Sequence, residues 1–181
     1  MIVVIDCGHG MNARVPFKND PGAVAGGHTE ADIVLDWGLT LKHYLTQAGI
    51  KVYMTRSTRA TGMPTLARAT WARSKRATHF ISLHCNAGPE SATGTETFYR
   101  KAGVWPQAVQ RAALKSLGLR NRGVKHESLS RRKRLAVLGA PNPCLLELGF
   151  ISNTADREKL LSREARIAFA QELVRYLTGL Q

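Results

Sequence analysis

The sequence predicts an α/β fold, in which a twisted, mostly parallel sheet of about six strands is packed between helices in a single domain. Short apolar segments typical of buried strands alternate along the chain with longer amphipathic segments typical of helices. Two of the apolar segments stop at glycine-rich or polar residues, as strands do where a loop begins. The 181 residues suffice for one domain with its own core and leave little room for a second.

The chain begins with a predicted strand at residues 2–5, an apolar run that ends at Asp6-Cys7-Gly8-His9-Gly10. Residues 11–28 contain many Gly, Pro, Asn and Asp residues and are expected to form a loop. A helix follows, which Thr29 can cap and which Gly49 ends. Its apolar residues recur at helical spacing and are Ile33, Trp37, Leu41, Tyr44, Leu45 and Ala48.

The rest of the chain continues the alternation of strands and helices. Proline opens two of the helices, and the last helix is amphipathic. The expected helices are 64–76, 106–118 and 164–177, and the expected strands are 51–55, 80–83, 95–99, 135–138 and 144–148. The strand at 80–83 ends at His84-Cys85-Asn86, so polar residues follow this strand as they follow the first.

The composition is that of a globular protein with an unusually high positive charge. The hydrophobic fraction of 44% and the charged fraction of 22% exclude a wholly disordered chain. The 26 Lys and Arg residues exceed the 13 Asp and Glu residues and give a net charge of +13. Such a protein is expected to bind polyanions such as nucleic acid, anionic lipid, lipopolysaccharide or a cell-wall polymer.

The cysteines and the first residues bear on where the protein is made. The three cysteines Cys7, Cys85 and Cys144 lack CxxC spacing, which argues against a disulfide framework and favours a reducing compartment. The first residues do not have the pattern of a signal peptide, and no stretch approaches the ~20 apolar residues of a membrane helix. We therefore expect synthesis in the cytoplasm, with another agent needed for any release.

Four residues with metal-binding or acid–base chemistry lie near predicted strand ends or a helix start. His9 and His84 follow strands, Glu147 ends the last strand, and Glu30 opens the first helix. In an open α/β sheet, functional sites form at the carboxyl ends of the parallel strands. Two imidazoles and one carboxylate are a ligand set of catalytic zinc, with a fourth position left for water.

The two carboxylates suit different roles. A helix N-terminus favours the ionised form of Glu30, which a metal ligand must have. Glu147 lies in an otherwise apolar strand end, where desolvation is expected to raise its pKa. A carboxylate with a raised pKa suits a proton shuttle near neutral pH.

Structural roles remain open for these residues on spacing alone. A histidine after a strand is more often a hydrogen-bonded structural residue than a ligand, and Glu30 could serve only the helix dipole. His28 could replace Glu30 as a ligand. Cys7 and Cys85 flank the histidines and could bind zinc as thiolates, although a small buried apolar role suits them better.

Several blocks of the sequence together resemble the zinc-dependent N-acetylmuramoyl-L-alanine amidases of the amidase-3 type. They occur in the family's order and cover nearly the whole chain. The blocks are Val3-Val4-Ile5-Asp6-Cys7-Gly8-His9-Gly10, Asp20-Pro21-Gly22-Ala23, Glu30-Ala31-Asp32-Ile33, Thr55-Arg56, Leu66-Ala67-Arg68, Ile81-Ser82-Leu83-His84-Cys85-Asn86-Ala87, Gly94-Thr95-Glu96, Arg122-Gly123-Val124-Lys125 and Leu146-Glu147-Leu148-Gly149-Phe150-Ile151-Ser152-Asn153.

The resemblance implies the site and its reaction. It implies one zinc ion per chain, held by His9, Glu30 and His84, with Glu147 as the catalytic carboxylate. Asn86 is a further candidate, for binding the substrate. It also implies hydrolysis of the amide between the lactyl group of N-acetylmuramic acid and L-alanine in peptidoglycan. Two positions depart from the family pattern: Met11 replaces a glycine, and Cys7 stands where proline is common.

The resemblance also bears on how the enzyme is regulated and how it reaches the cell wall. Some periplasmic members carry an inhibitory helix after the second histidine, and the short spacing between Asn86 and Gly94 leaves no room for one. We expect residues 1–181 to form one catalytic domain without a separate wall-binding domain. Together with the expected cytoplasmic synthesis, this favours a monomeric phage or prophage endolysin that a holin releases onto the wall.

The positive charge is concentrated between Arg100 and Arg134, a stretch with 11 Lys and Arg residues and one acid, Glu127. Its densest part is Arg131, Arg132, Lys133 and Arg134, called here the basic run. The basic run could be a solubilising surface. We favour an anion-binding surface for lipopolysaccharide or wall polymers, because the charge is one-sided.

Two other functions compete with the amidase. A zinc peptidase or deacylase would use the same metal on a different amide. A nucleic-acid-binding module would explain the charge, but the basic stretch contains only Trp105 as an aromatic and this function leaves Glu147 unexplained. We therefore expect peptidoglycan as the partner and no specific nucleic acid.

Overall fold

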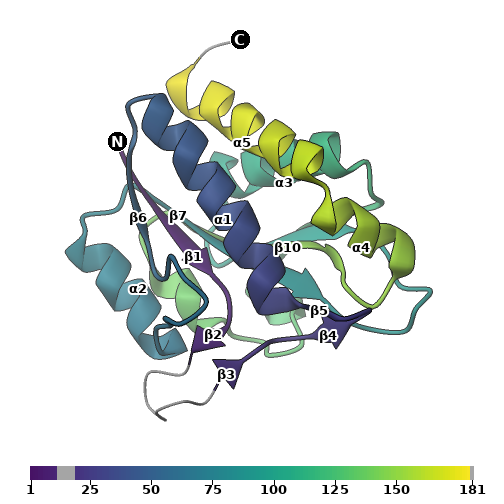
Figure 1. Cartoon of the computed structure of the whole chain (residues 1–181). Coiled ribbons are helices and arrows are strands. Elements are labelled where there is room, and N and C mark those ends of the chain that lie inside the picture. Colours follow the sequence, from purple (N-terminus) through teal and green to yellow (C-terminus); the bar gives the residue numbers. More distant parts are fainter. Residues whose placement is uncertain (12–18, 180–181) are drawn as a thin grey trace.

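The central element of the structure is a six-stranded sheet. The computed structural model describes residues 1–11 and 19–179 (Figure 1). The strands lie in the order β6-β1-β7-β10-β8-β9. Their bounds are β1 (Ile2–Cys7), β6 (Lys51–Met54), β7 (His79–Asn86), β8 (Thr95–Tyr99), β9 (Asn121–His126) and β10 (Pro143–Phe150). β6, β1, β7 and β10 are parallel, whereas β8 runs antiparallel to β10 and carries β9 parallel to itself. The predicted α/β fold with a mostly parallel sheet is confirmed.

Helices cover both faces of this sheet. On one face lie α1 (Glu30–Gln47), α3 (Val104–Leu117) and α5 (Arg163–Thr178), which Figure 1 shows side by side. On the other face lie α2 (Thr65–Ser74) and the 3-10 helix η2 (Ala136–Gly139). The remaining helical elements are η1 (Glu127–Leu129) and α4 (Thr154–Leu161). In the part of the chain that the structure describes, no helix combines the length and apolarity needed to cross a bilayer.

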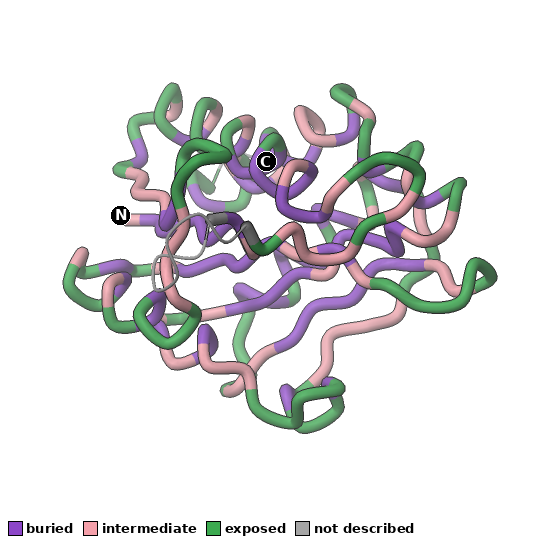
Figure 2. The backbone as a smooth tube through the Cα atoms, turned by 60° about the horizontal axis from the view of Figure 1, so that its bottom comes forward, coloured by how far each residue is buried: buried purple, intermediate pink, exposed green. Residues whose placement is uncertain are grey.

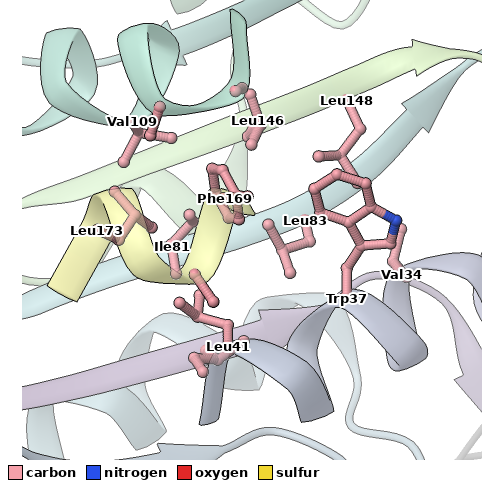
Figure 3. Packing of buried hydrophobic residues seen from close by; sticks show 14 of the residues in the cluster. Val34, Trp37, Leu41, Ile81, Leu83, Val109, Leu146, Leu148, Phe169 and Leu173 are labelled. Atoms are coloured by element: carbon pink, nitrogen blue, oxygen red, sulfur yellow. The ribbon is translucent and has the colours of Figure 1, made fainter. Parts of the chain in front are cut away.

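The larger core lies between the sheet and α1, α3 and α5. Trp37 of α1 packs against Phe169 of α5, with ring centroids 5.5 Å apart, and its indole nitrogen donates to the Leu160 carbonyl. Figure 3 shows these rings among other buried side chains of the same core, such as Leu83 of β7 and Leu148 of β10. The start of α1 is fixed by its cap, because the Thr29 hydroxyl accepts from the Asp32 amide at 3.1 Å.

The opposite face of the sheet changes from apolar to polar along its strands. Near its start, each of three strands contributes a buried apolar side chain to the α2 and η2 layer, from Val4, Phe80 and Leu145. Side chains alternate between the two faces of a sheet, so every second residue of a strand lies on the same face. Further along these three strands, this face therefore carries the polar residues Asp6, Ser82, His84 and Glu147. The carboxyl ends of these strands therefore present polar groups at one edge of the sheet.

Short strands complete this edge. β2 (Gly10–Met11) pairs with β3 (Asn19–Asp20), and β4 (Val24–Ala25) pairs with β5 (His28–Thr29). Figure 1 shows them between the end of β1 and the start of α1. The prediction of a plain loop over 11–28 is therefore wrong where these pairs form, and its residues 12–18 lie outside the described part.

One predicted strand is wrong and one real strand was not predicted. Residues 135–138 were expected to be a strand, but η2 forms there, because Leu138 and Ala140 bond back to the carbonyls of Leu135 and Val137. Two consecutive buried side chains, Val137 and Leu138, pack toward α2 instead of alternating. The sixth strand is β9, a polar edge strand whose sequence lacks apolar alternation. Figure 2 shows the inner strands buried and the outer turns exposed.

Candidate metal centre

The side chains of His9, Glu30 and His84 meet at the carboxyl edge of the sheet. His9 Nε2 lies 3.0 Å and His84 Nδ1 lies 2.9 Å from Glu30 Oε1. One ligand atom from each residue lies within 4.8 Å of the other two. β1 places His9, β7 places His84, and the first turn of α1 places Glu30. The structure thus brings together the three residues that the sequence singled out.

This donor set fits a zinc ion. Two imidazole nitrogens and one carboxylate oxygen are the ligands of many catalytic zinc sites. The Glu30 side chain is only 5% exposed, whereas the His9 and His84 side chains are 23% and 18% exposed, so one side stays open for water and substrate. Glycines make room for the ligands. A Cβ on Gly8 would lie 2.4 Å from the His84 ring, and one on Gly22 would lie 2.6 Å from Glu30 Oε2.

Glu30 is held in its ionised form. Its Oε1 accepts from the Cys85 amide and its Oε2 from the Ala23 amide, both at 3.0 Å. Burial alone raises the pKa of Glu30, but hydrogen bonds and charge from His84 and His9 outweigh burial and hold that pKa well below its usual range. His28, the alternative ligand, is exposed in β5 and is not part of this group.

His9 has an unusual backbone, and Arg56 fixes it. The φ of His9 is 61°, in the left-handed region that few residues other than glycine occupy. The buried Arg56 guanidinium donates to the carbonyls of Cys7 at 3.0 Å, Gly8 at 2.7 Å and Ala31 at 2.6 Å. Arg56 therefore ties the loop that carries His9 to the start of the helix that carries Glu30.

A second buried arginine supports the same loop. Arg68 Nη1 lies 3.2 Å from Oδ1 of the fully buried Asp6, and its Nη2 donates to the His9 carbonyl at 3.4 Å. Asp6 also accepts from Thr55 Oγ1 at 2.7 Å and from Ser82 Oγ at 2.6 Å. Sequence reasoning missed Asp6, Arg56 and Arg68 as parts of the site. Their only signal was that they lie in blocks of the family resemblance.

This arrangement predicts that Arg56→Lys lowers zinc affinity while the protein stays folded. A lysine can reach only some of the three carbonyls, so the His9 loop is less well fixed. We expect a loss on the order of tenfold, as for other residues that support metal ligands. Titration of the metal-free protein against a zinc chelator measures this loss. Arg59→Lys, at an exposed arginine that pairs with Asp32, is the matched control. Equal affinities of both variants and the wild type would contradict this role.

Glu147 lies next to the three candidate metal ligands. In the sheet register it is opposite His84 of β7 on one side and Glu96 of β8 on the other. Its side chain is half-buried, and among the described residues its shielded Oε2 has no hydrogen-bond partner. Burial raises the pKa of Glu147 well above its usual range, and the negative charges of Glu30 and Glu96 raise it further. An unpaired carboxylate with these properties can take up and release a proton.

The cysteines next to the histidines belong to the core. Cys7, Cys85 and Cys144 are all free and buried. Burial raises the pKa of the Cys7 thiol to about 12, which the charge of Arg56 lowers and that of Asp6 raises by smaller amounts. Burial also raises the pKa of Cys85 well above its usual value. Neutral thiols are poor zinc ligands, which agrees with the apolar role expected from the sequence.

The remaining predicted site residues lie in two different places. Asn86 follows His84 by two residues, and its amide donates to Glu96 Oε1 at 2.6 Å, so it lies beside Glu147. The basic run forms an exposed turn between η1 and η2, after the carboxyl end of β9. Because β9 runs opposite to β10, that end lies at the far edge of the sheet from the metal ligands.

Asp20 adds a second carboxylate on the outer side of His9. Its Oδ1 lies 3.0 Å from His9 Nδ1, although the pair lacks the alignment of a hydrogen bond. A carboxylate at the far nitrogen of a metal-binding imidazole is a common support that orients the ring. Burial lowers the pKa of His9, but Glu30 and Asp20 together outweigh burial and raise it above its usual value.

Known proteins resemble this chain over most of its length. Residues 3–178 match the family described as N-acetylmuramoyl-L-alanine amidase, Amidase_3. The uncharacterized protein YqiI of Bacillus subtilis strain 168 is 32% identical over 180 residues, which are 95% of this chain and 81% of that protein. The N-acetylmuramoyl-L-alanine amidase CwlM of Bacillus licheniformis is 32% identical over 181 residues, and the match spans 64% of its length.

Solved structures share the fold over nearly the whole chain. The catalytic domain of CwlV, an N-acetylmuramoyl-L-alanine amidase from Bacillus (Paenibacillus) polymyxa var. colistinus, has a TM-score of 0.83 at 27% identity, covering 98% of this chain and 96% of that one. The N-acetylmuramoyl-L-alanine amidase of Clostridium difficile 630 has a TM-score of 0.82 at 26% identity, covering 98% and 95%. Because the family match covers nearly all of the chain, this protein belongs to the Amidase_3 family of N-acetylmuramoyl-L-alanine amidases.

Proposed function

We propose that this protein is a zinc-dependent amidase that hydrolyses the bond between the lactyl group of N-acetylmuramic acid and L-alanine in peptidoglycan. The observation that carries the proposal is the convergence of His9, Glu30 and His84 beside the unpaired carboxylate of Glu147. The family match and the named activities of its relatives support the choice of this amide.

Metal binding and proton transfer would be carried out by different residues of the chain. His9, Glu30 and His84 would hold one zinc ion, which supplies Lewis-acid and water-activating chemistry when bound. Glu147 Oε2 would accept a proton from the attacking water and later deliver it to the leaving nitrogen of L-alanine. The water oxygen bonds to the lactyl carbonyl carbon, the carbon–nitrogen bond breaks, and the products are a muramic acid carboxylate and a peptide with a free amino terminus.

Digestion of purified peptidoglycan tests this proposal. The products should contain new L-alanine amino termini, and treatment with a chelator should abolish their release. A zinc peptidase with the same ligand set would instead release amino termini of residues further along the peptide, or from the cross-links. That result, or full activity of a metal-free preparation, would overturn the proposal.

We further propose that the basic run holds the enzyme on anionic polymers of the wall or on lipopolysaccharide. All four of its side chains are exposed on a turn away from the metal ligands, so they can bind a surface without blocking the site. Attraction between such charges reaches only about 10 Å at 0.1 M salt. Surface capture by the basic run should therefore weaken as salt rises.

Neutralising Arg131, Arg132, Lys133 and Arg134 together to glutamine should weaken binding to intact sacculi or outer membrane. Turnover of a small soluble muropeptide should change little, because that substrate needs no surface capture. Salt titrations of sacculus binding and of muropeptide turnover make the two measurements. The control carries four glutamines at exposed positions outside the basic run, Lys42, Lys101, Arg111 and Lys159. If control and variant bind sacculi equally, the basic run is only a solubilising surface.

Cytoplasmic synthesis, release by a holin, a phage or prophage origin and a monomeric state stay predictions, and the relatives named above come from bacteria. We propose that the protein acts on the wall only after such a release. Fractionation of producing cells with and without a holin tests the route, and analytical ultracentrifugation tests the oligomeric state.

A further inference from the structure

Two cationic side chains of β9, Arg122 and Lys125, bind Glu96, which is the neighbour of Glu147 in the sheet. Glu96 is buried in β8, next to Glu147 in the sheet register. Its Oε2 lies 2.5 Å from Lys125 Nζ and 3.3 Å from Arg122 Nε, and its Oε1 accepts from the Asn86 amide. We call Asn86, Glu96, Arg122 and Lys125 the Glu96 cluster. None of these residues belongs to the candidate metal-binding group of His9, Glu30 and His84.

The Glu96 cluster contains one more positive charge than is needed to neutralise the Glu96 carboxylate. One cation suffices to neutralise Glu96, and the Asn86 amide already satisfies the other carboxylate oxygen. A second cation beside the first leaves a net positive charge in a half-buried place, where charge is costly unless it is paired. The Lys125 and Arg122 side chains are still 29% and 30% exposed, so both can meet a ligand from solvent.

The Arg122 guanidinium is held in place on several sides. Besides Glu96, the Arg122 guanidinium donates to the Thr93 carbonyl and lies over the Phe150 ring at 4.9 Å. An arginine held on several sides loses little side-chain freedom when it binds a carboxylate. These features favour a built binding position over a pair of loose surface charges.

The Glu96 cluster lies within reach of a substrate at the site. Glu147 and Glu96 are on neighbouring strands, which lie about 4.8 Å apart. A dipeptide in extended conformation spans about 7 Å. A peptide whose scissile amide lies at Glu147 can therefore place a charged group of its next residue against Lys125 and Arg122.

We propose that Arg122 and Lys125 form a subsite for a free carboxylate of the peptide stem, on the residue that follows L-alanine. In peptidoglycan this residue is a γ-linked D-glutamate, whose α-carboxylate is either free or amidated. The Glu96 cluster would select the free acid, because only the acid can form charge-assisted hydrogen bonds with both cations. This inference rests on the proposed amidase function and names the substrate group that the same site recognises.

Two substrates that differ only at this carboxylate test the subsite. They are N-acetylmuramoyl-L-alanyl-γ-D-glutamyl-L-lysine and its D-isoglutamine counterpart. We expect the wild type to cleave the acid with a kcat/KM about tenfold or more above that of the amide, mainly through KM. Lys125→Gln and Arg122→Gln should each bring this ratio toward one by slowing cleavage of the acid. Each variant leaves Glu96 one cation, and zinc content and thermal denaturation check that it folds.

The ratio separates recognition from other effects. Loss of a cation near Glu147 changes the behaviour of that carboxylate equally on both substrates, so it cancels in the ratio. Lys42→Gln, at an exposed lysine of α1, removes the same charge elsewhere and should leave the ratio unchanged. A wild-type ratio near one, or a ratio that both variants preserve, would overturn the subsite. Failure of the wild type to cleave either substrate would instead overturn the amidase function.

Discussion

Replacement of Glu147 by alanine or glutamine is expected to lower kcat on a muropeptide by about 10²–10⁴, while the folded protein keeps its zinc. The effect is large because both replacements remove the group that takes up and returns the proton. The expectation depends on Glu147 lying beside the three ligands without being one of them. Zinc analysis of the purified variants and steady-state kinetics make the measurement, with Glu158→Gln at an exposed position of α4 as the control. A folded Glu147 variant without zinc would place this residue among the ligands.

The same glutamine variant should stabilise the metal-free protein at neutral pH. Folding raises the pKa of Glu147, so the folded state favours the protonated carboxyl. This contribution to stability is fully present below the ordinary pKa of a glutamate and is lost as the pH rises above it. A neutral glutamine avoids that loss. The melting temperature of Glu147→Gln relative to the wild type should therefore increase between pH 4 and pH 7. Over this range the wild type comes to carry a shielded negative charge at residue 147 that the variant lacks. A constant difference over this range would mean that Glu147 is not desolvated.

The largest effect of all is expected for His84→Ala, which should remove both zinc and activity. Two remaining ligands hold zinc poorly, and Glu30 loses its hydrogen bond to the imidazole. Metal analysis after dialysis and the rate of muropeptide cleavage measure the two losses. His28→Ala removes an exposed histidine two residues from Glu30 and should keep one zinc per chain. If His84→Ala retains zinc and activity, the metal lies elsewhere.

The three residues of the candidate metal site could be grouped from the sequence because the ends of buried strands are recognisable in it. His9 and His84 follow buried apolar runs, and Glu30 follows a recognisable helix cap. Parallel strands bring their carboxyl ends to the same edge, so residues far apart in the chain could be grouped before any contact was known. Glu147 stood out for the same reason, as an acid in a strand end that is otherwise apolar.

The supporting residues could not be predicted, because their partners are not visible in any local pattern. Arg56 bonds to backbone carbonyls about 25 to 49 positions away, and every residue has such a carbonyl. Strand β9 was missed because Val124 is the one apolar side chain among its six residues, so apolar periodicity gives no signal. At η2 a strand was predicted where a 3-10 helix forms, because a short apolar run does not distinguish the two. This run packs against α2 and is not part of the sheet.

The identity of the cleaved amide is tested most directly by following the oxygen atom of water through the reaction. Peptidoglycan fragments are digested in water enriched in the heavy oxygen isotope, and both products are weighed by mass spectrometry. We expect the label to enter the lactyl carboxylate of muramic acid, and the released peptide to carry an unlabelled, free L-alanine amino terminus. Label in a peptide carboxylate, with L-alanine still attached to muramic acid, would show that the site cleaves a different amide and that the protein is not a muramoyl-L-alanine amidase.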